Sequence, residues 1–415
     1  MSPEPKPVQV QGAPDALPYG RQSIDEADIA AVVAALRSER LAHGPQVGDF
    51  EAAFASAVDA RAAAACSSGT AALHLALAAL DVGAGDLCVV PAITFLATAT
   101  AVRFCGAEVL FADVDPASGL ITPETLQAAL MRAGGPVKAV LPVHLGGRIC
   151  EMESISAVAR SAGAKVVEDA CHALGGTDSA GRPVGGCALS DAAVFSFHPV
   201  KTIAAGEGGM VTCPDPERAE RMRRLANHGV ARTPDLFAYP DLSLEEDGSP
   251  NPWSYEQIEL GFNYRMNEME AALGLSQLGR LERFVRRRRT LTALYDLVLA
   301  PLAPLVQPVR GHSGDRPSLH LYQVQIDFEA AGVGRGEVMR RLQAQGVGSQ
   351  VHYIPVYRQP YFRSRYGDQR LEGAEAFYAR VLALPLFPAM HDADVERVAQ
   401  ALERALEAMR SDAAS

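Results

Sequence analysis

Lysine is scarce in this chain of 415 residues, and one lysine stands where it could act as a nucleophile. The four lysines are Lys6, Lys138, Lys165 and Lys201. Lys201 follows the apolar run 195–197 and precedes the glycine-rich stretch 206–209. A surface position is the ordinary alternative for a lysine, but an amine removed from water loses its proton more readily and can attack a carbonyl carbon. Lys201 is therefore the candidate for Schiff-base chemistry.

Two carboxylates stand at the end of another apolar run. Val166 and Val167 are followed at once by Glu168 and Asp169. If the run is a strand of a parallel sheet, these acids lie at the carboxyl edge, where such sheets bind ligands. An acid that ends a strand is also a common turn former, so this position alone leaves both interpretations open.

A third segment could hold a phosphate. Residues 66–70, C-S-S-G-T, lead directly into an Ala/Leu-rich stretch typical of a helix. Backbone N–H groups at a helix N-terminus converge on anions, although Ser and Thr at such positions are also ordinary helix caps. A lysine to bond the aldehyde, a carboxylate to keep the pyridine nitrogen protonated and a cradle for the phosphate are together what a pyridoxal phosphate (PLP) enzyme needs.

The elements that must position these residues alternate between strands and helices. Apolar runs at 89–90, 109–111, 137–143, 166–167 and 194–197 predict strands, and stretches such as 71–80 and 122–130 predict helices. This alternation indicates an α/β fold with a mainly parallel sheet covered on both faces. Ser23 and Glu26 have the spacing of a helix capping box.

The second half of the chain predicts a smaller unit. Residues 267–299 carry the apolar spacing of one long helix, and 300–415 mix short strands, at 322–328 and 348–352, with helices. The interpretation is a flexible lead-in at 1–16, a large domain at 17–265, and a linking helix with a small α+β domain at 266–415. Four successive arginines, 286–289, point in every direction on a helix and indicate a solvated surface.

Composition excludes several classes of protein. The net charge of −11 disfavours nucleic-acid binding. The most apolar stretch, 88–102, falls short of the about 20 residues that a membrane-spanning helix needs, and the N-terminus has no apolar signal region. Seven scattered cysteines without a C-x-x-C pair favour a reduced, cytoplasmic protein with no metal site.

Four motifs then make the sequence recognisable. The chain closely resembles the DegT/DnrJ/EryC1/StrS family of sugar aminotransferases through S-S-G-T-A-A-L-H-L-A-L, E-D-A-C-H-A-L-G-G, S-F-H-P-V-K-T-I-A-A-G-E-G-G and G-F-N-Y-R-M-N-E-M-E-A-A-L-G, and the likeness runs from about Leu17 onward. Segments 18–24, 253–265 and 350–357 resemble the branch that serves pseudaminic acid biosynthesis. The resemblance implies the aspartate-aminotransferase fold (fold type I), with a mainly parallel seven-stranded sheet and an active site at the interface of a homodimer.

The resemblance also implies roles for individual residues. Lys201 is the Schiff-base lysine, and Asp169 is the partner of the pyridine nitrogen. The other cofactor contacts are Gly69, Thr70, Phe95, His172, Ser196 and, from the partner subunit's copy of the chain, Asn263. The sugar-nucleotide contacts are Tyr19, Glu39, Arg40, Leu41, Ala42, Gly69, Ser196, Asn263, His352, Tyr353, Ile354 and Pro355. Phe95 could instead be a core residue, and Tyr19 and His352 could be packing residues.

The implied reaction moves the amino group of L-glutamate to C4 of a UDP-4-keto-6-deoxy-N-acetylhexosamine. A different nucleotide-sugar aminotransferase, of the GDP-perosamine or UDP-bacillosamine type, is the nearest alternative. A non-catalytic regulatory protein of the same fold is another, although the intact Lys201, Asp169 and Ser196 argue against it. Related sugar dehydratases carry His in place of the lysine, so Lys201 argues against that activity as well.

Overall fold

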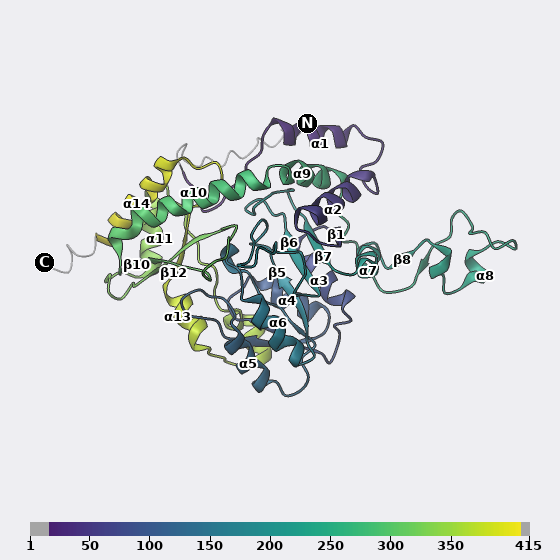
Figure 1. The fold of residues 1–415 in the computed structure, drawn as a ribbon, viewed down its shortest axis with the longest axis horizontal. Helices are drawn as coiled ribbons and strands as arrows, with labels where there is room; N and C mark the ends of the chain where they lie inside the picture. The colour runs from purple at the N-terminus through teal and green to yellow at the C-terminus, as the bar shows by residue number, and fades with distance from the viewer. Residues whose placement is uncertain (1–15, 408–415) are drawn as a thin grey trace, which may run out of the picture.

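A seven-stranded sheet forms the centre of the molecule (Figure 1) in a computed structural model that describes residues 16–407. Most of the predicted lead-in at 1–16, including Lys6, lies outside these residues. The strands follow in the spatial order β1 (Ala62–Cys66), β7 (Gly209–Cys213), β6 (Ala192–Ser196), β5 (Lys165–Asp169), β4 (Ala139–Val140), β2 (Leu87–Pro91) and β3 (Glu108–Ala112). Only β7 runs antiparallel to its neighbours. The predicted α/β fold with a mainly parallel seven-stranded sheet is confirmed.

Helices cover both faces of this sheet. Along β1 and β6 the alternate residues Ala64, Cys66, Ala192 and Val194 join one buried cluster, and Ala63, Ala65, Ala193 and Phe195 join another. This period of two is what a strand buried on both faces requires. The surrounding helices are α1 (Glu26–Leu36), α2 (Pro45–Ala57), α3 (Gly69–Ala79), α4 (Leu96–Phe104), α5 (Pro123–Arg132), α6 (Met152–Ser161) and α7 (Pro216–Ala226).

The C-terminal part has a sheet and a core of its own. Its strands are β10 (Val306–Pro308), β11 (Tyr322–Ile326) and β12 (Val381–Leu384), and its helices are α10 (Leu281–Leu299), α11 (Arg335–Ala344), α12 (Pro360–Tyr366), α13 (Glu372–Arg380) and α14 (Asp392–Glu407). The preceding helix, α9 (Glu268–Leu278), packs against α1 and α2 of the large unit. Tyr357, Phe362 and Phe377 nevertheless pack into the core of the large sheet. At the other end, Leu17 pairs with Val347. The two units are therefore joined by the chain's first described residues and by two of its later helices.

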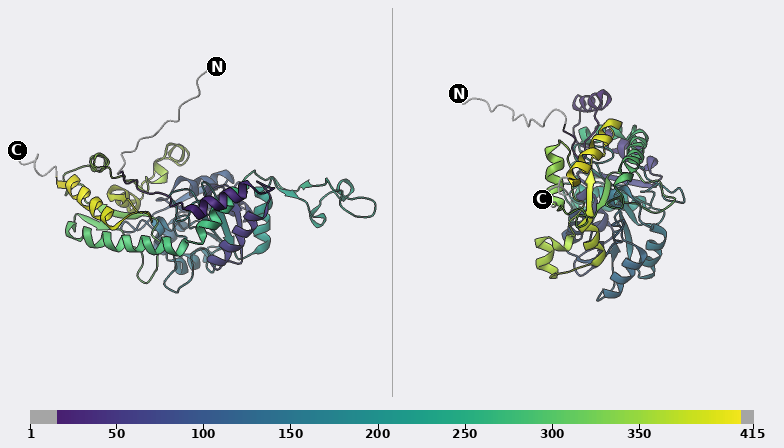
Figure 2. Two further views of the ribbon diagram at one scale, coloured as in Figure 1. Left: turned by 90° about the horizontal axis from the view of Figure 1, so that it is seen from above. Right: turned by 90° about the vertical axis from the view of Figure 1, so that its left-hand side faces the viewer.

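A long arm leaves the body between α7 and α9 (Figures 1 and 2). It contains β8 (Val230–Ala231), the short helix α8 (Pro240–Ser243) and β9 (Glu256–Gln257), with β8 paired antiparallel to β9. Short 3₁₀ turns complete the connections: η1 (Leu145–Gly147), η2 (Pro234–Leu236), η3 (Ala300–Leu302) and η4 (Val356–Arg358).

Three sequence-based predictions of local structure are wrong. The single helix expected over 267–299 is two helices, because the chain breaks at Gly279 and Arg280. Residues 348–352 form only an isolated bridge, from Gln350 to Ala383. The capping box lies at Asp25 and Asp28, not at Ser23 and Glu26, since Asp25 accepts the backbone N–H of Asp28 and the Asp28 carboxylate accepts that of Asp25.

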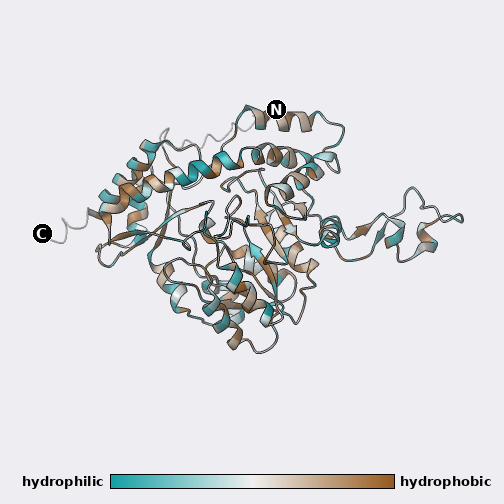
Figure 3. Ribbon diagram, in the orientation of Figure 1, coloured by the Kyte–Doolittle hydropathy of each residue, from teal (hydrophilic) through white to brown (hydrophobic). Residues whose placement is uncertain are grey.

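The arginine run on α10 is also more buried than expected. Figure 3 shows the hydrophilic residues of α10 gathered in one stretch. Arg288 has no exposed surface, and its Nη1 donates to the carbonyl oxygens of His320 and Leu386. Arg287 and Arg289 donate to backbone carbonyls as well. The solvated-surface interpretation fails for Arg288 because α10 lies against the C-terminal unit, so a side chain on its inner face meets protein instead of water.

Across residues 16–407, no helix is both long and apolar enough to cross a bilayer. All seven cysteines are unpaired thiols.

Candidate active site

A cavity of about 750 Å³ opens where the strands of the large sheet end. The carboxyl ends of β5 and β6 supply Asp169 and Ser196, and the N-terminus of α3 supplies Gly69 and Thr70. The expected residues that line it are Tyr19, Gly69, Thr70, Phe95, Asp169, His172, Ser196, Lys201, His352, Tyr353 and Ile354. Because parallel strands end at one edge, segments far apart in sequence meet here, as the topology predicts.

The α3 N-terminus has the geometry of an anion cradle. Ser68 is the N-cap, and its hydroxyl accepts the backbone N–H of Ala71 at 3.1 Å, so the cap interpretation of this segment holds. The N–H groups of Gly69 and Thr70, at the start of the helix, have no intrahelical partner. A Cβ on Gly69 would lie 2.7 Å from the Cβ of Ser196, so only glycine lets the helix end approach Ser196 this closely. Capping and anion binding are therefore compatible in this segment.

Asp169 is the carboxylate that faces the cavity. It is buried, its Oδ2 accepts the hydroxyl of Thr98 at 2.7 Å, and its Oδ1 accepts the backbone N–H of Cys171 at 3.2 Å. Glu168 points to the other side of β5, where its carboxylate accepts from Nε2 of His144 at 2.8 Å and from the hydroxyl of Ser190. The two neighbouring acids are thus separated by the pleat of the strand, and only Asp169 can reach a bound group.

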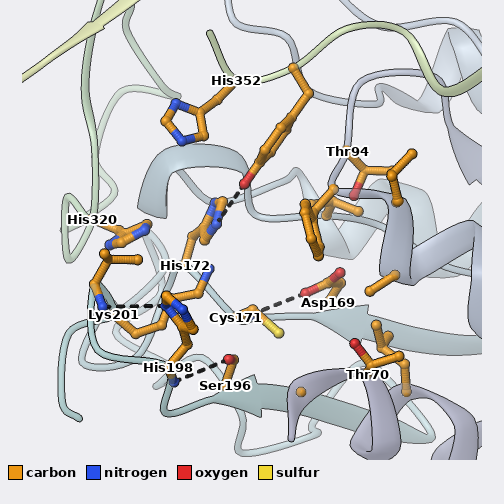
Figure 4. A pocket seen from close by; sticks show the side chains of 18 of the residues that line it. Thr70, Thr94, Asp169, Cys171, His172, Ser196, His198, Lys201, His320 and His352 are labelled. Atoms are coloured by element: carbon orange, nitrogen blue, oxygen red, sulfur yellow. Dashed lines mark hydrogen bonds between the residues drawn. The ribbon is translucent and has the colours of Figure 1, made fainter. Parts of the chain in front are cut away.

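Lys201 reaches the same cavity from the loop after β6. Removal from water lowers the pKa of its amine, while Cys171 and Asp169 nearby oppose this shift. Figure 4 shows Lys201 with His172 and His320 on one side of the cavity, and Asp169 with Thr70 on the other. A ring between them would have an amine at one end and a carboxylate at the other.

Buried histidines make up the wall behind Lys201. The rings of His172 and His320 lie 4.5 Å apart. Burial and the nearby charge of Lys201 lower the pKa of His172 well below its usual value, and they lower the pKa of His352 to about 3. These side chains are therefore neutral imidazoles at ordinary pH, suited to hydrogen bonding and not to ion pairing.

Several expected residues do not line this chain's own cavity. Glu39, Arg40, Leu41 and Ala42 lie in an exposed loop, which is anchored where Glu268 accepts the backbone N–H groups of Gly44 and Gln46. Asn263 is exposed and bridges to Asn227. Pro355 is buried beside the cavity wall.

Phe95, Tyr19 and His352 each had two possible roles, one in packing and one in the cavity. Phe95 is 54% exposed and lines the cavity, so the core interpretation of this residue is wrong. Tyr19 and His352 pack on each other, with ring centroids 5.5 Å apart, and both also line the cavity. Packing and a place in the cavity wall therefore coexist at these two positions.

Sequence reasoning missed some lining residues. Four of them, Thr94, Cys171, His198 and Gln350, lie within three positions of a residue that the sequence did predict. Closeness in sequence to a predicted site residue could therefore have found them. His320, which lines the cavity, and Thr98, which holds Asp169 from outside it, offered no such signal. The contact of Thr98 with Asp169 spans 71 residues, and His320 arrives from the C-terminal unit.

The comparisons with known proteins agree with this geometry. A model of the DegT/DnrJ/EryC1/StrS aminotransferase family matches residues 22–403. The chain is 38% identical over 389 residues to the spore coat polysaccharide biosynthesis protein SpsC of Bacillus subtilis (strain 168), an alignment that covers 93% of this chain and 96% of SpsC.

Two solved structures are similar over nearly the whole chain. Helicobacter pylori PseC, an aminotransferase involved in pseudaminic acid biosynthesis, has a TM-score of 0.85 at 26% identity and covers 95% of this chain and 100% of PseC. The PLP form of Spr1654 from Streptococcus pneumoniae has a TM-score of 0.83 at 25% identity and covers 95% of this chain and 99% of its own.

Fold, site and similarity together define the class as a PLP-dependent aminotransferase that acts on sugars. The chain belongs to the DegT/DnrJ/EryC1/StrS aminotransferase family. The cavity fits the cofactor, since it combines a cradle that a Cβ on Gly69 would fill, a buried carboxylate at Asp169 and a desolvated amine at Lys201. When bound there, PLP supplies an electron sink that stabilises negative charge on a carbon next to nitrogen.

Proposed function

We propose that this aminotransferase moves the amino group of L-glutamate to C4 of UDP-2-acetamido-2,6-dideoxy-β-L-arabino-hex-4-ulose, as pseudaminic acid biosynthesis requires. The observation that carries the proposal is the position of segment 350–354. The stretch that resembles the pseudaminic branch forms the cavity wall together with Tyr19. The similarity to PseC over 95% of the chain supports the same assignment.

The residues of the cavity have distinct tasks in this reaction. Lys201, whose lowered pKa makes the neutral amine available, removes and returns the proton at the reacting carbon. Asp169, held by Thr98, keeps its carboxylate directed at the pyridine nitrogen. Ser196 and the α3 N-terminus bind phosphate oxygens. Glutamate and the keto sugar react in turn, so we expect ping-pong kinetics.

The sugar nucleotide needs a different kind of surface. A uracil ring and a diphosphate call for aromatic faces and hydrogen-bond donors. Tyr19 and His352 supply hydrogen-bond donors, and the ring of Tyr353 supplies an aromatic face, on the wall formed by Tyr19 and 350–354. This wall is therefore the proposed determinant of substrate choice.

We further propose that two chains form a homodimer with shared active sites. Loop 39–42 and Asn263 lie outside the cavity of their own chain, which leaves them available to the partner's cavity. The arm between α7 and α9 leaves the body (Figure 1), and its segment exposes large apolar side chains, among them Trp253 at 73% and Leu260 at 82%. Exposed apolar surface of this kind is typical of interaction sites.

The substrate assignment is tested by comparing kcat/KM for three ketones. These are the proposed L-arabino ketone, its D-xylo epimer and GDP-4-keto-6-deoxymannose, each with L-glutamate as donor and with the product identified by mass spectrometry and NMR. We expect clear preference for the first, because a pocket that holds C4 at reacting distance discriminates between configurations. Preference for the second or third would assign the bacillosamine or perosamine type instead. No turnover with any ketone would support the regulatory alternative.

A further inference from the structure

The hydrogen bonds of His172 fix the direction of a donor in the cavity. The backbone N–H of Gly146 donates to Nδ1 of His172 at 3.1 Å. A backbone N–H can only donate, so Nδ1 carries no hydrogen and the single hydrogen of the neutral ring is on Nε2. Nε2 lies 3.3 Å from the hydroxyl oxygen of Tyr353 (the dashed line at His172 in Figure 4). The imidazole therefore donates to the phenol, and the phenol must direct its own hydrogen elsewhere.

The geometry of Gly146 holds this direction in place. Gly146 has a φ of 67°, and a Cβ there would lie 2.7 Å from Oε1 of Gln323 and 2.9 Å from Nη1 of Arg148. Only glycine fits this turn, so the amide that orients His172 is rigidly placed. The ring of His320 at 4.5 Å and the hydroxyl of Ser318, which donates to the carbonyl of His172, hold the imidazole from other sides. Burial and the nearby charges of Lys201 and Arg148 disfavour protonation of the ring.

The hydroxyl of Tyr353 has an open position facing the cavity. Within residues 16–407 it makes no hydrogen bond other than that with His172. The Tyr353 ring lies 5.9 Å from the ring of Phe95, and both side chains line the same cavity as Lys201. A fixed donor without an acceptor, on a residue that lines the cavity, points to an acceptor on the substrate.

We propose that the Tyr353 hydroxyl, oriented by His172, donates a hydrogen bond to the oxygen on C4 of the keto sugar. The proposal rests on the proposed function. A neutral phenol suits a carbonyl oxygen, whereas the carboxylates of glutamate are better matched by cations. As the amine nitrogen bonds to C4, this oxygen gains negative charge, so a donor aimed at it stabilises the transition state more than the ground state.

The atoms of this step balance without proton transfer from the tyrosine. A carbon–nitrogen double bond replaces the carbon–oxygen double bond, and the oxygen leaves as water with two hydrogens that come from the amine nitrogen. Tyr353 keeps its own hydrogen throughout. It is thus a catalytic residue for the sugar half of the reaction only, and His172 is its positioning residue.

The test separates the two half-reactions by rapid mixing of holoenzyme with glutamate alone, and of the aminated enzyme with keto sugar alone. Tyr353→Phe should slow the sugar half-reaction on the order of 10- to 100-fold and leave the glutamate half-reaction unchanged. Cofactor content and the affinity for the UDP-amino-sugar product should also stay unchanged, because an amine at C4 offers no carbonyl oxygen. Tyr361→Phe is the matched control, since Tyr361 is an exposed residue outside the cavity and its hydroxyl contacts only Arg103 among the described residues.

A second pair of variants tests the orientation. His172→Gln keeps an acceptor for Gly146 and a donor for Tyr353, so it should retain the sugar half-reaction better than His172→Leu. In the Tyr353→Phe background the two His172 variants should no longer differ in that half-reaction. Equal slowing of both halves by Tyr353→Phe, or slowing of neither, would overturn the inference. If the wild-type protein aminates no keto sugar, the proposed function is rejected independently of the Tyr353 variants. The glutamate half-reaction then shows whether the protein is still an aminotransferase.

Discussion

Burial gives Lys201 a reactivity that the other described lysines lack. Its lowered pKa means that the folded protein binds fewer protons at this site than the unfolded chain. The stability of the cofactor-free protein should therefore rise as the pH is raised through the folded-state pKa toward the ordinary value for lysine. Below the folded-state pKa the penalty for the buried ammonium is fully present.

We expect Lys201→Met to abolish transamination while removing this rise in stability, as measured by thermal unfolding of cofactor-free protein across alkaline pH. Lys165→Met is the control, because Lys165 is largely exposed and paired with Asp191. In wild-type holoenzyme, borohydride reduction and peptide mapping should place the pyridoxyl label on Lys201. A label on Lys138 or Lys165 would reject the assignment.

The two adjacent acids on β5 should behave oppositely when neutralised. Asp169→Asn keeps the shape and the hydrogen bond with Thr98 but removes the charge facing the cavity. We expect turnover to fall by roughly 100-fold or more, the scale of a lost charge-stabilising group, with the thermal midpoint nearly unchanged. Glu168→Gln should instead lower the thermal midpoint, since His144 and Ser190 depend on that carboxylate, and it should spare cofactor binding. The reverse pattern would make Glu168 the partner of the pyridine nitrogen.

At the scale of elements, the contact between α3 and β6 decides whether the phosphate cradle exists. Gly69→Ala would force a Cβ to within 2.7 Å of the Ser196 Cβ and push the helix end away from the strand. We expect a loss of about 1–3 kcal/mol in unfolding free energy, the usual cost of overpacking, together with weaker cofactor binding measured by equilibrium dialysis. Ser196→Gly in the same chain should restore part of the stability, because it removes the Cβ that the new side chain meets.

Gly48→Ala is the control for this change. Gly48 also lies in the first turns of a helix, α2, but a Cβ there would meet open space. Alanine at an exposed helical position should stabilise the protein by about 0.5–1 kcal/mol and leave cofactor binding unchanged. If Gly69→Ala, like Gly48→Ala, lowers neither the unfolding free energy nor cofactor binding, the α3 N-terminus can accommodate a Cβ and this prediction is wrong.

Elements with a strong local signal were predictable, and those defined by distant contacts were not. The apolar runs of β2, β3, β5 and β6 were evident, because burial on both faces produces continuous hydrophobic sequence. The alanine-rich β1 and the glycine-led β7 were missed, since neither Ala nor Gly favours strands, and only pairing with neighbours holds them there. The break between α9 and α10 was hidden because Gly279 interrupts a stripe that stays apolar on both sides.

The same distinction holds for the site. Lys201, Asp169 and the 66–70 cradle could be proposed from the sequence because each stands beside a recognisable strand or helix. Thr98, His320 and the bond from Gly146 to His172 depend on how separate segments meet. No spacing along the chain encodes such contacts, so the orientation of the site could only be read from the structure.

At the scale of the whole molecule, the question is which chain completes each cavity. Asn263 lies at the base of the arm, is exposed, and does not line the cavity of its own chain. The backbone carbonyl of its neighbour Tyr264 accepts the backbone N–H of Ser67 at 2.7 Å. The chain next to Asn263 is therefore bonded to the cradle at 66–70, although Asn263 itself does not line the cavity. A residue placed in this way can serve a cavity on another chain.

Mixed dimers test this arrangement directly. A chain with Lys201→Ala and a differently tagged chain with Asn263→Ala are refolded or co-expressed together, and the doubly tagged dimer is purified. If Asn263 acts across the interface, one cavity collects both defects and the other has neither, so activity should return to about half the wild-type value per dimer because one of two independent sites is intact. Dimers of two tagged Lys201→Ala chains should stay inactive. If Asn263 serves its own chain, each cavity carries one defect and the mixed dimer will show no more activity than the Asn263→Ala parent; a monomer on sedimentation would exclude the shared site altogether.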